Sequence, residues 1–316
     1  MKSLKLLALP VCVLFFLAFG RSAFAQTSAA DRARLLRSQA NLPPSGVSVS
    51  PEGVDQNYAA ASPNDSDLGE QAILKRVEKY KAFTFEVGVP MYYTSNVALV
   101  EHNKMSDFIV APVVGLTYSP RFQNTLYGEF TLRQQFFYYQ DFTSFNFASF
   151  DAIAGVVYYA PTLHNMAVRA NLNYNRLTPT DSFDDFFSNV GLGLSAEIPF
   201  AIGRAQQVSV GTDANISLYA TPSEPQRTDL GAYVGYAVSL TRNLYLNASG
   251  HVVLRPYHEN GRTDVSEILS FGANYRVRDW LTISALSSFV ANQSNQNIFK
   301  YEVFNIGGGI AVSWRF

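Results

Sequence analysis

From residue 82 to the carboxyl terminus, apolar and polar residues alternate along the chain. In the last segment, Phe304, Ile306, Gly308, Ile310, Val312, Trp314 and Phe316 share one face, and Asn305, Gly307, Gly309, Ala311, Ser313 and Arg315 share the other. This period of two is typical of a β-strand with one buried face. The pattern recurs, and the sequence predicts twelve strands, at 82–95, 108–119, 125–138, 147–159, 166–177, 188–199, 206–219, 229–240, 244–256, 264–277, 280–291 and 303–316.

The connections between these strands alternate in length. Short turns centre on Pro120, Pro161, Ile202, Thr241 and Arg278, and between them lie longer polar loops such as Val97–Asp107, Thr178–Phe187, Thr221–Thr228 and Asn292–Glu302. The exception is Asn260-Gly261, which signals a tight hairpin. An even number of strands with short turns at one end and long loops at the other is typical of outer-membrane barrels. We therefore expect an all-β fold, a 12-stranded antiparallel transmembrane β-barrel with short periplasmic turns and longer extracellular loops.

A water-soluble barrel has the same alternation, so composition has to decide between the two. Of the 316 residues, 47% are hydrophobic, 14% are aromatic and only 16% are charged, against roughly 25% charged in soluble domains. Aromatic residues gather near strand ends, at Tyr92-Tyr93, Phe136 to Tyr139, Tyr158-Tyr159, Phe186-Phe187 and Trp280, as two interfacial girdles require. Lys104 and Lys300, the two lysines after Phe83, lie in long loops. These features favour a barrel that faces lipid.

Residues 1–25 have the pattern of a secretory signal peptide. Lys2 and Lys5 precede an apolar run from Leu6 to Phe19, and Ala23-Phe24-Ala25 forms a small-residue cleavage site. The alternative, an uncleaved anchor helix, is disfavoured because the run falls short of the roughly 20 residues that span a bilayer. The sole cysteine, Cys12, lies in this segment. The mature chain is thus expected to have no disulfide, thiolate nucleophile or cysteine metal site.

Residues 26–81 are predicted to form a flexible periplasmic segment with short helices, followed by the barrel at 82–316. The proline-containing stretch Leu42–Gly53 separates candidate helices at Ala30–Gln39 and Asp67–Tyr80. For the second helix, a marginal helix outside the barrel is favoured over a plug inside the lumen. Seven basic residues balance seven acidic ones, so we expect no nucleic-acid partner. A periplasmic protein is a candidate partner for this segment.

Two short motifs resemble known families. Trp314-Arg315-Phe316, a terminal Phe on an alternating strand, resembles the carboxy-terminal signature of bacterial outer-membrane barrels. This resemblance implies that Phe316 is an assembly signal for the barrel-assembly machinery and that the protein lies among the lipids of a Gram-negative outer membrane. Tyr92-Tyr93-Thr94-Ser95-Asn96-Val97 resembles β-barrel porin families, some of which accompany exopolysaccharide secretion genes.

A search for catalytic motifs is negative. His102, His164, His251 and His258 include no pair at i, i+4 spacing, and there is no G-x-S-x-G, phosphate loop or G-x-G-x-x-G after a strand. We expect no metal and no cofactor. Some outer-membrane barrels are lipid hydrolases with a His and a Ser facing the bilayer. Here the alternation places His251 and Ser249 together on the lumen face, which makes this alternative a minor one.

Charged residues on the predicted lumen face are the candidate functional residues. Those near mid-depth, which we consider constriction candidates, are Arg133, Asp151, Asp213 and His251; those toward the periplasm are Glu129, Arg169, Glu197, Arg276 and Arg315. Arg133 and Asp151 lie on adjacent strands at similar depth, so they could pair directly. These charges fit a selective constriction or salt bridges that fill a narrow barrel equally well. The loop Thr178–Phe187 is expected to be a surface loop, with an inward gate as the alternative.

The sequence thus predicts a porin-like channel for passive passage of small polar solutes. The barrel region carries 14 basic and 18 acidic residues, so we expect weak ion selectivity at most. An accessory barrel of an exopolysaccharide or envelope export system and an outer-membrane lipid-modifying hydrolase are the alternatives.

Overall fold

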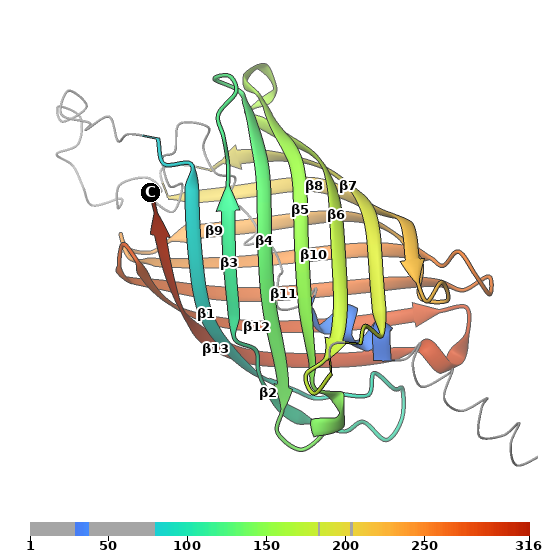
Figure 1. The fold of residues 1–316 in the computed structure, drawn as a ribbon. Coiled ribbons are helices and arrows are strands. Elements are labelled where there is room, and N and C mark those ends of the chain that lie inside the picture. Colours follow the sequence, from blue (N-terminus) through green and yellow to red (C-terminus); the bar gives the residue numbers. More distant parts are fainter. Residues whose placement is uncertain (1–28, 38–79, 183, 203–204) are drawn as a thin grey trace, which may run out of the picture.

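The computed structural model describes residues 29–37, 80–182, 184–202 and 205–316. Its strands are β1 (Phe83–Thr94), β2 (Asp107–Val110), β3 (Val113–Tyr118), β4 (Leu126–Tyr139), β5 (Phe147–Ala160), β6 (Met166–Pro179), β7 (Phe187–Ala201), β8 (Gln206–Thr221), β9 (Thr228–Ser239), β10 (Leu244–Pro256), β11 (Thr263–Arg278), β12 (Leu281–Ser294) and β13 (Tyr301–Arg315). Short 3-10 helices are η2 (Thr143–Phe145), η3 (Pro161–Leu163) and η4 (Asn297–Phe299). Each strand pairs antiparallel with its neighbours, as Figure 1 shows.

Strands β2 and β3 are two parts of one barrel strand. Both pair with β1 in a single register, Met91 opposite Val110 and Gly88 opposite Val113. The ladder is interrupted between them because Pro90 and Pro112 lack the N–H that a regular pairing uses. The backbone N–H of Ala111 still reaches the carbonyl of Pro90 at 2.8 Å. The barrel therefore has twelve strands across its wall.

The barrel closes where β1 meets β13. The two strands pair from Thr84 opposite Arg315 to Thr94 opposite Asn305. Phe83 and Phe316 extend this seam: each N–H bonds the carbonyl of the other, at 3.1 and 3.0 Å, and their rings stack. The predicted all-β, twelve-stranded antiparallel barrel is confirmed, with every strand boundary within three residues of its expected position.

Large apolar side chains cover the outside of the barrel, including Leu132, Leu172 and Ile310, each more than half exposed. The aromatic residues near strand ends only partly follow the expectation of interfacial girdles. Because neighbouring residues of a strand point to opposite faces, Tyr93 faces outward while Tyr92 is buried in the lumen. The same division applies to Tyr138 and Tyr139 and to Tyr158 and Tyr159, where the first residue of each pair is exposed and the second is buried. Within the described ranges, no helix has both the length and the apolar character needed to cross a bilayer.

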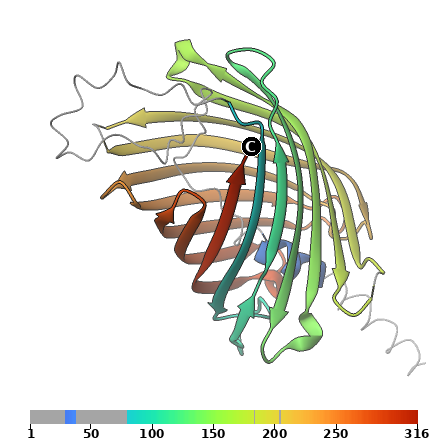
Figure 2. The same ribbon diagram turned by 60° about the vertical axis from the view of Figure 1, so that its left-hand side comes forward.

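A helix at residues 29–37, called the lumen helix here, lies inside the barrel near the long-loop end (Figures 1 and 2). Ala30, Ala33 and Leu36 pack in one cluster with Tyr92 and Phe137 of the wall. The first candidate helix is thus present, but this part of it lies in the lumen, where we expected a periplasmic segment. Residues 1–28 and 38–79 lie outside the described residues, and with them the signal peptide and most of the helix expected at 67–80.

The lumen is filled at one end and accessible at the other. On the long-loop side, the inward residues Ser270, Ser288 and Asn305 are at most 5% exposed. On the same strands toward the short turns, inward residues such as Gly272 and Ser284 are partly exposed. Solvent therefore reaches the lumen from the periplasmic end to about mid-depth, and the lumen helix and inward side chains fill the remainder.

Candidate functional site

The lumen helix connects two apolar patches on different parts of the barrel wall. Ala30, Ala33 and Leu36 contact the first patch, and Leu35 contacts the second. The larger wall side chains of the first patch are Tyr92, Ile109, Phe137, Tyr139, Phe147, Leu177 and Phe187; those of the second are Val253, Ile268, Val290, Tyr301 and Val303. A water-filled channel would not keep such side chains on its inner face, because exposed apolar surface is costly. The helix covers this surface.

One carboxylate of the helix is held by three residues of the wall, Arg227, Tyr257 and Arg262, which we call the arginine cradle. Arg227 Nη1 donates to Asp31 Oδ1 at 3.1 Å, and Arg262 Nη1 donates to Asp31 Oδ2 at 2.8 Å. The Tyr257 hydroxyl also donates to Oδ1, at 3.2 Å. Both carboxylate oxygens are therefore bonded, and two of the three donors carry a positive charge.

The wall itself orients both arginines of the cradle. Arg227 Nε bonds Asp229 at 2.8 Å, and Arg262 bonds Asp264 through Nε at 3.0 Å and through Nη2 at 2.5 Å. The Arg262 guanidinium also lies over the rings of Phe299 and Tyr257, at 3.5 and 4.0 Å from their centroids. These contacts fix its plane, so the cradle does not depend on the helix for its shape.

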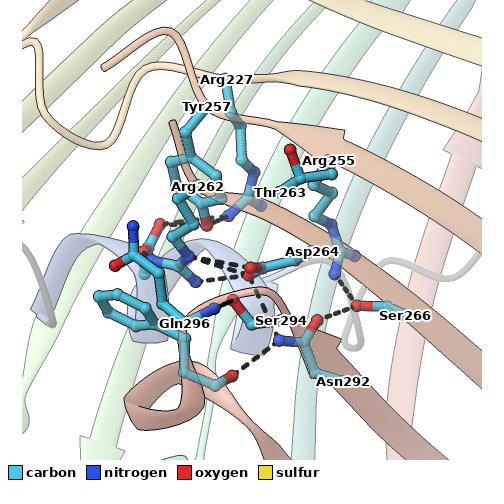
Figure 3. A network of polar contacts seen from close by, with 12 residues as sticks. Arg227, Arg255, Tyr257, Arg262, Thr263, Asp264, Ser266, Asn292, Ser294 and Gln296 are labelled. Atoms are coloured by element: carbon cyan, nitrogen blue, oxygen red, sulfur yellow. Dashed lines mark hydrogen bonds and ion pairs between the residues drawn. The ribbon is translucent and has the colours of Figure 1, made fainter. Parts of the chain in front are cut away.

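Around the cradle, further polar contacts join neighbouring strands, as Figure 3 shows. Arg255 donates to the Ser266 hydroxyl, which in turn donates to Asn292. Asn292 then bonds Asp264 at 3.3 Å. These buried polar groups brace β10, β11 and β12 behind the cradle, which is the arrangement that keeps a buried binding site rigid.

The local turn places the cradle residues next to one another. Asn260 and Gly261 have φ values of +63° and +58°, as expected of the predicted tight hairpin. This turn sets the Tyr257 N–H against the Arg262 carbonyl at 2.9 Å, and a β-bridge joins Arg227 to Tyr257. Three loop-end residues thus become neighbours.

Burial affects the charge states of the cradle residues. It raises the pKa of the Tyr257 phenol, so this hydroxyl stays protonated and can donate to Asp31. Burial alone would lower the pKa of the Arg227 guanidinium, but Asp229, Tyr257 and Asp31 outweigh it and hold the pKa well above its ordinary value. Nearby, burial and the charge of Arg227 lower the pKa of Arg34 to about 10. All three arginine and tyrosine groups of the cradle keep their protons at neutral pH.

The carboxyl end of the lumen helix is bonded to the barrel wall near mid-depth of the lumen. Arg37 Nη1 lies 2.5 Å from Asp151 Oδ1, and Asn175 Nδ2 donates to the same oxygen at 2.9 Å. Arg133 is directly opposite Asp151 in the register of β4 and β5. The two residues are thus neighbours as predicted, but the ion pair that they could form does not occur among the described residues, where Asp151 pairs with Arg37. Sequence spacing within the barrel could not reveal a competitor from the amino-terminal segment.

The other two mid-depth candidates meet on another part of the wall. His251 Nε2 lies 3.0 Å from Asp213 Oδ1, and the Tyr233 ring packs edge-on against the imidazole. Gly231 makes this approach possible, since a Cβ there would meet both side chains at 2.3 to 2.5 Å. The Ser249 hydroxyl bonds Ser270 at 2.6 Å. No hydrogen bond of Ser249 to His251 occurs in the described part of the chain, and neither residue faces the bilayer.

The charged residues predicted on the periplasmic side line the accessible part of the lumen or its rim. Glu129, Arg169 and Glu197 lie on the inward faces of β4, β6 and β7; Arg276 lies on β11, and Arg315 ends β13 at the mouth. Glu197 accepts a hydrogen bond from Tyr233 at 2.8 Å. Across the described ranges, no group of three or more histidine and acidic side chains is placed to hold a metal ion.

Two of the long loops place side chains against the barrel wall. In 178–187, Asp184 and Asp185 are exposed while Phe186 and Phe187 pack inward, so the acidic residues stay at the surface as expected. In the loop after β1, the buried Asn96 side chain donates to the carbonyls of Val100 and Glu302, at 2.7 and 2.9 Å. Asn96 thereby attaches this loop to β13 across the seam.

Comparisons with known proteins agree with this geometry at the level of the fold. An outer membrane channel from Pseudomonas putida is similar over 75% of this chain and 97% of that chain, at 11% identity and a TM-score of 0.53. The fold is that of an outer-membrane β-barrel. The translocator domain of autotransporter NalP from Neisseria meningitidis (13% identity, 76% of this chain, 90% of that chain, TM-score 0.44) and the KdgM porin (9%, 72%, 99%, 0.41) also match. No protein-family model and no curated protein matches the sequence.

Proposed function

We propose that the protein is an outer-membrane channel of a Gram-negative bacterium for the passive passage of small polar solutes, closed at its long-loop end by the lumen helix. One observation carries the proposal: a separate nine-residue helix closes this barrel. In a barrel filled by its own wall, side chains of the strands meet across the lumen. Here the two apolar wall patches meet the helix between them.

The lining of the accessible half supports passage of polar molecules. Apart from Arg276 and Arg315 near the mouth, its inward positions on β11, β12 and β13 are small or uncharged, including Gly272, Asn274, Ser284, Gly309 and Ser313. At mid-depth, the pair Arg37–Asp151 combines both signs of charge, and the carboxylate of Asp213 lies beside His251. Mixed charge at the narrow part of a polar pore favours small solutes without strong preference for one ion sign.

Conductance in planar bilayers tests this proposal. The full chain is compared with a variant that lacks residues 29–37, and a variant that lacks residues 44–52, an equal length of the proline-containing stretch, serves as the control. We expect stable single-channel steps from the first variant, and rare or brief openings from the full chain and the control. If neither the full chain nor the first variant gives reproducible steps while both migrate as assembled barrels, the proposed function is refuted.

A further inference from the structure

The arginine cradle is built from a repeated tripeptide. Arg-Thr-Asp occurs at 227–229 and again at 262–264, at the long-loop ends of β9 and β11. In each copy the arginine donates from Nε to the aspartate two residues later, at 2.8 Å for Arg227 and 3.0 Å for Arg262. A strand's period of two places both side chains of a copy on the lumen face. The barrel thus presents two oriented guanidinium groups on either side of Tyr257.

The donors that remain fit a carboxylate. Nη1 of both arginines and the Tyr257 hydroxyl converge on the two oxygens of Asp31 within 2.8 to 3.2 Å. Planar guanidinium groups match the planar carboxylate and bind it more strongly than they bind neutral acceptors. All of these side chains are less than a tenth exposed, so bulk water competes little for the donors.

The charge balance of the cluster also favours an anionic ligand. Arg227, Arg255 and Arg262 face the carboxylates of Asp229 and Asp264. Without the lumen helix, which carries both Asp31 and the nearby Arg34, the wall cluster therefore has three positive groups against two negative ones. A buried cation without a partner is costly, so the vacated cradle favours one further negative charge and disfavours a neutral solute.

We propose that the arginine cradle is a binding site for the carboxylate of a small anionic solute, and that Asp31 occupies this site from within the chain. The inference rests on the proposed channel function, because the solute has to enter the lumen from the long-loop end. Solute and Asp31 compete for the same three donors, so binding of one excludes the other. A bound solute then shifts the lumen helix toward release by mass action.

Chemical rescue in the full chain tests whether the cradle binds a carboxylate, and it needs no conductance measurement. Asp31→Ala leaves a space of carboxylate size between the donors, whereas Asp31→Asn fills the same space with a neutral amide. We titrate isotope-labelled acetate into the detergent-solubilised proteins and follow its binding by NMR. Acetate is expected to bind the Asp31→Ala chain at least tenfold more tightly than the unmodified chain or the Asp31→Asn chain. Adding Tyr257→Phe should weaken it several-fold. Equal acetate affinity for all three chains overturns the proposal.

Solute competition on the unmodified chain gives a second, independent measurement. Sodium glucuronate on the long-loop side of a planar bilayer should raise the open fraction with a saturating dose response, and glucose at the same concentration should not. The same response to both sugars, or none to glucuronate, contradicts the proposal. If the Asp31→Ala variant binds acetate but the unmodified chain never conducts, only the channel proposal is refuted. If the unmodified chain conducts but the Asp31→Ala variant does not bind acetate, only the cradle proposal is refuted.

Discussion

Leu35→Ala is expected to open the channel. The Leu35 side chain is 4% exposed and packs against Val253, Ile268 and Val290 of the wall. Truncating a buried leucine to alanine costs about 2 to 5 kcal/mol. This cost applies to the docked helix and not to the released one. At about 1.4 kcal/mol for each factor of ten, the ratio of open to closed channel should rise roughly 30-fold to several-thousand-fold.

Single-channel recording in planar bilayers measures this ratio directly. Alanine is a better helix former than leucine, so any loss of closure has to come from the contact with the wall and not from the helix itself. Leu254→Ala is the matched control, because Leu254 neighbours Val253 on β10 but faces outward at 40% exposure. An open fraction that Leu35→Ala leaves unchanged, or that Leu254→Ala raises equally, would refute the assignment of the helix as the closing element.

Three further predictions test other parts of the molecule. Asp151→Asn removes the partner of Arg37 and should shift ion preference toward anions, measured as the reversal potential in a salt gradient; an unchanged potential means that this pair does not face the solute path. Asn96→Ala leaves two carbonyls without their donor and should cost about 1 to 3 kcal/mol locally, seen as faster amide exchange at 97–104 and not in the distant strands. Deleting Phe316 removes two seam hydrogen bonds and the expected assembly signal, so the yield of heat-modifiable barrel should fall, and an unaltered yield would contradict this.

The strands could be predicted because lipid and lumen impose the same alternation on each of them. A position such as Ile306 faces lipid and its neighbour Asn305 faces the lumen, and this contrast persists along whole strands. The break at Ala111 and Pro112 was not predicted. It depends on Pro90 lying near it across β1, which only the register of the two strands reveals.

The helix at 29–37 is predicted from the sequence but its place in the lumen is not, although the sequence contains a sign of it. On the long-loop half of several strands, the face that points inward is apolar: Tyr301 and Val303 precede Asn305 on the lumen side of β13, and Phe137 and Tyr139 end the lumen side of β4. We assigned such aromatics to the lipid interface by their position near strand ends. When each of these residues is assigned to the lumen or the lipid face by the alternation, the apolar lumen positions indicate that something occupies the lumen.

The contacts of Asp31 were beyond sequence reasoning. It lies 196 positions from Arg227 and 231 from Arg262, and no local pattern links residues so far apart. The repeated Arg-Thr-Asp was visible, but each copy alone is consistent with a solvated loop end. The hairpin at Asn260 and the bridge between Arg227 and Tyr257 are what turn two ordinary tripeptides into one site.

Release of the lumen helix and its unfolding are expected to be one event. Helices shorter than about 12 residues are marginal in water, and this one has nine described residues. Its helical form therefore depends on the contacts of Leu35 and Leu36 with the wall and on the cradle around Asp31. A released segment loses all of these contacts together, so its helical form is no longer stabilised. The gating that we propose is then an order–disorder transition of a short segment, and the walls need not move.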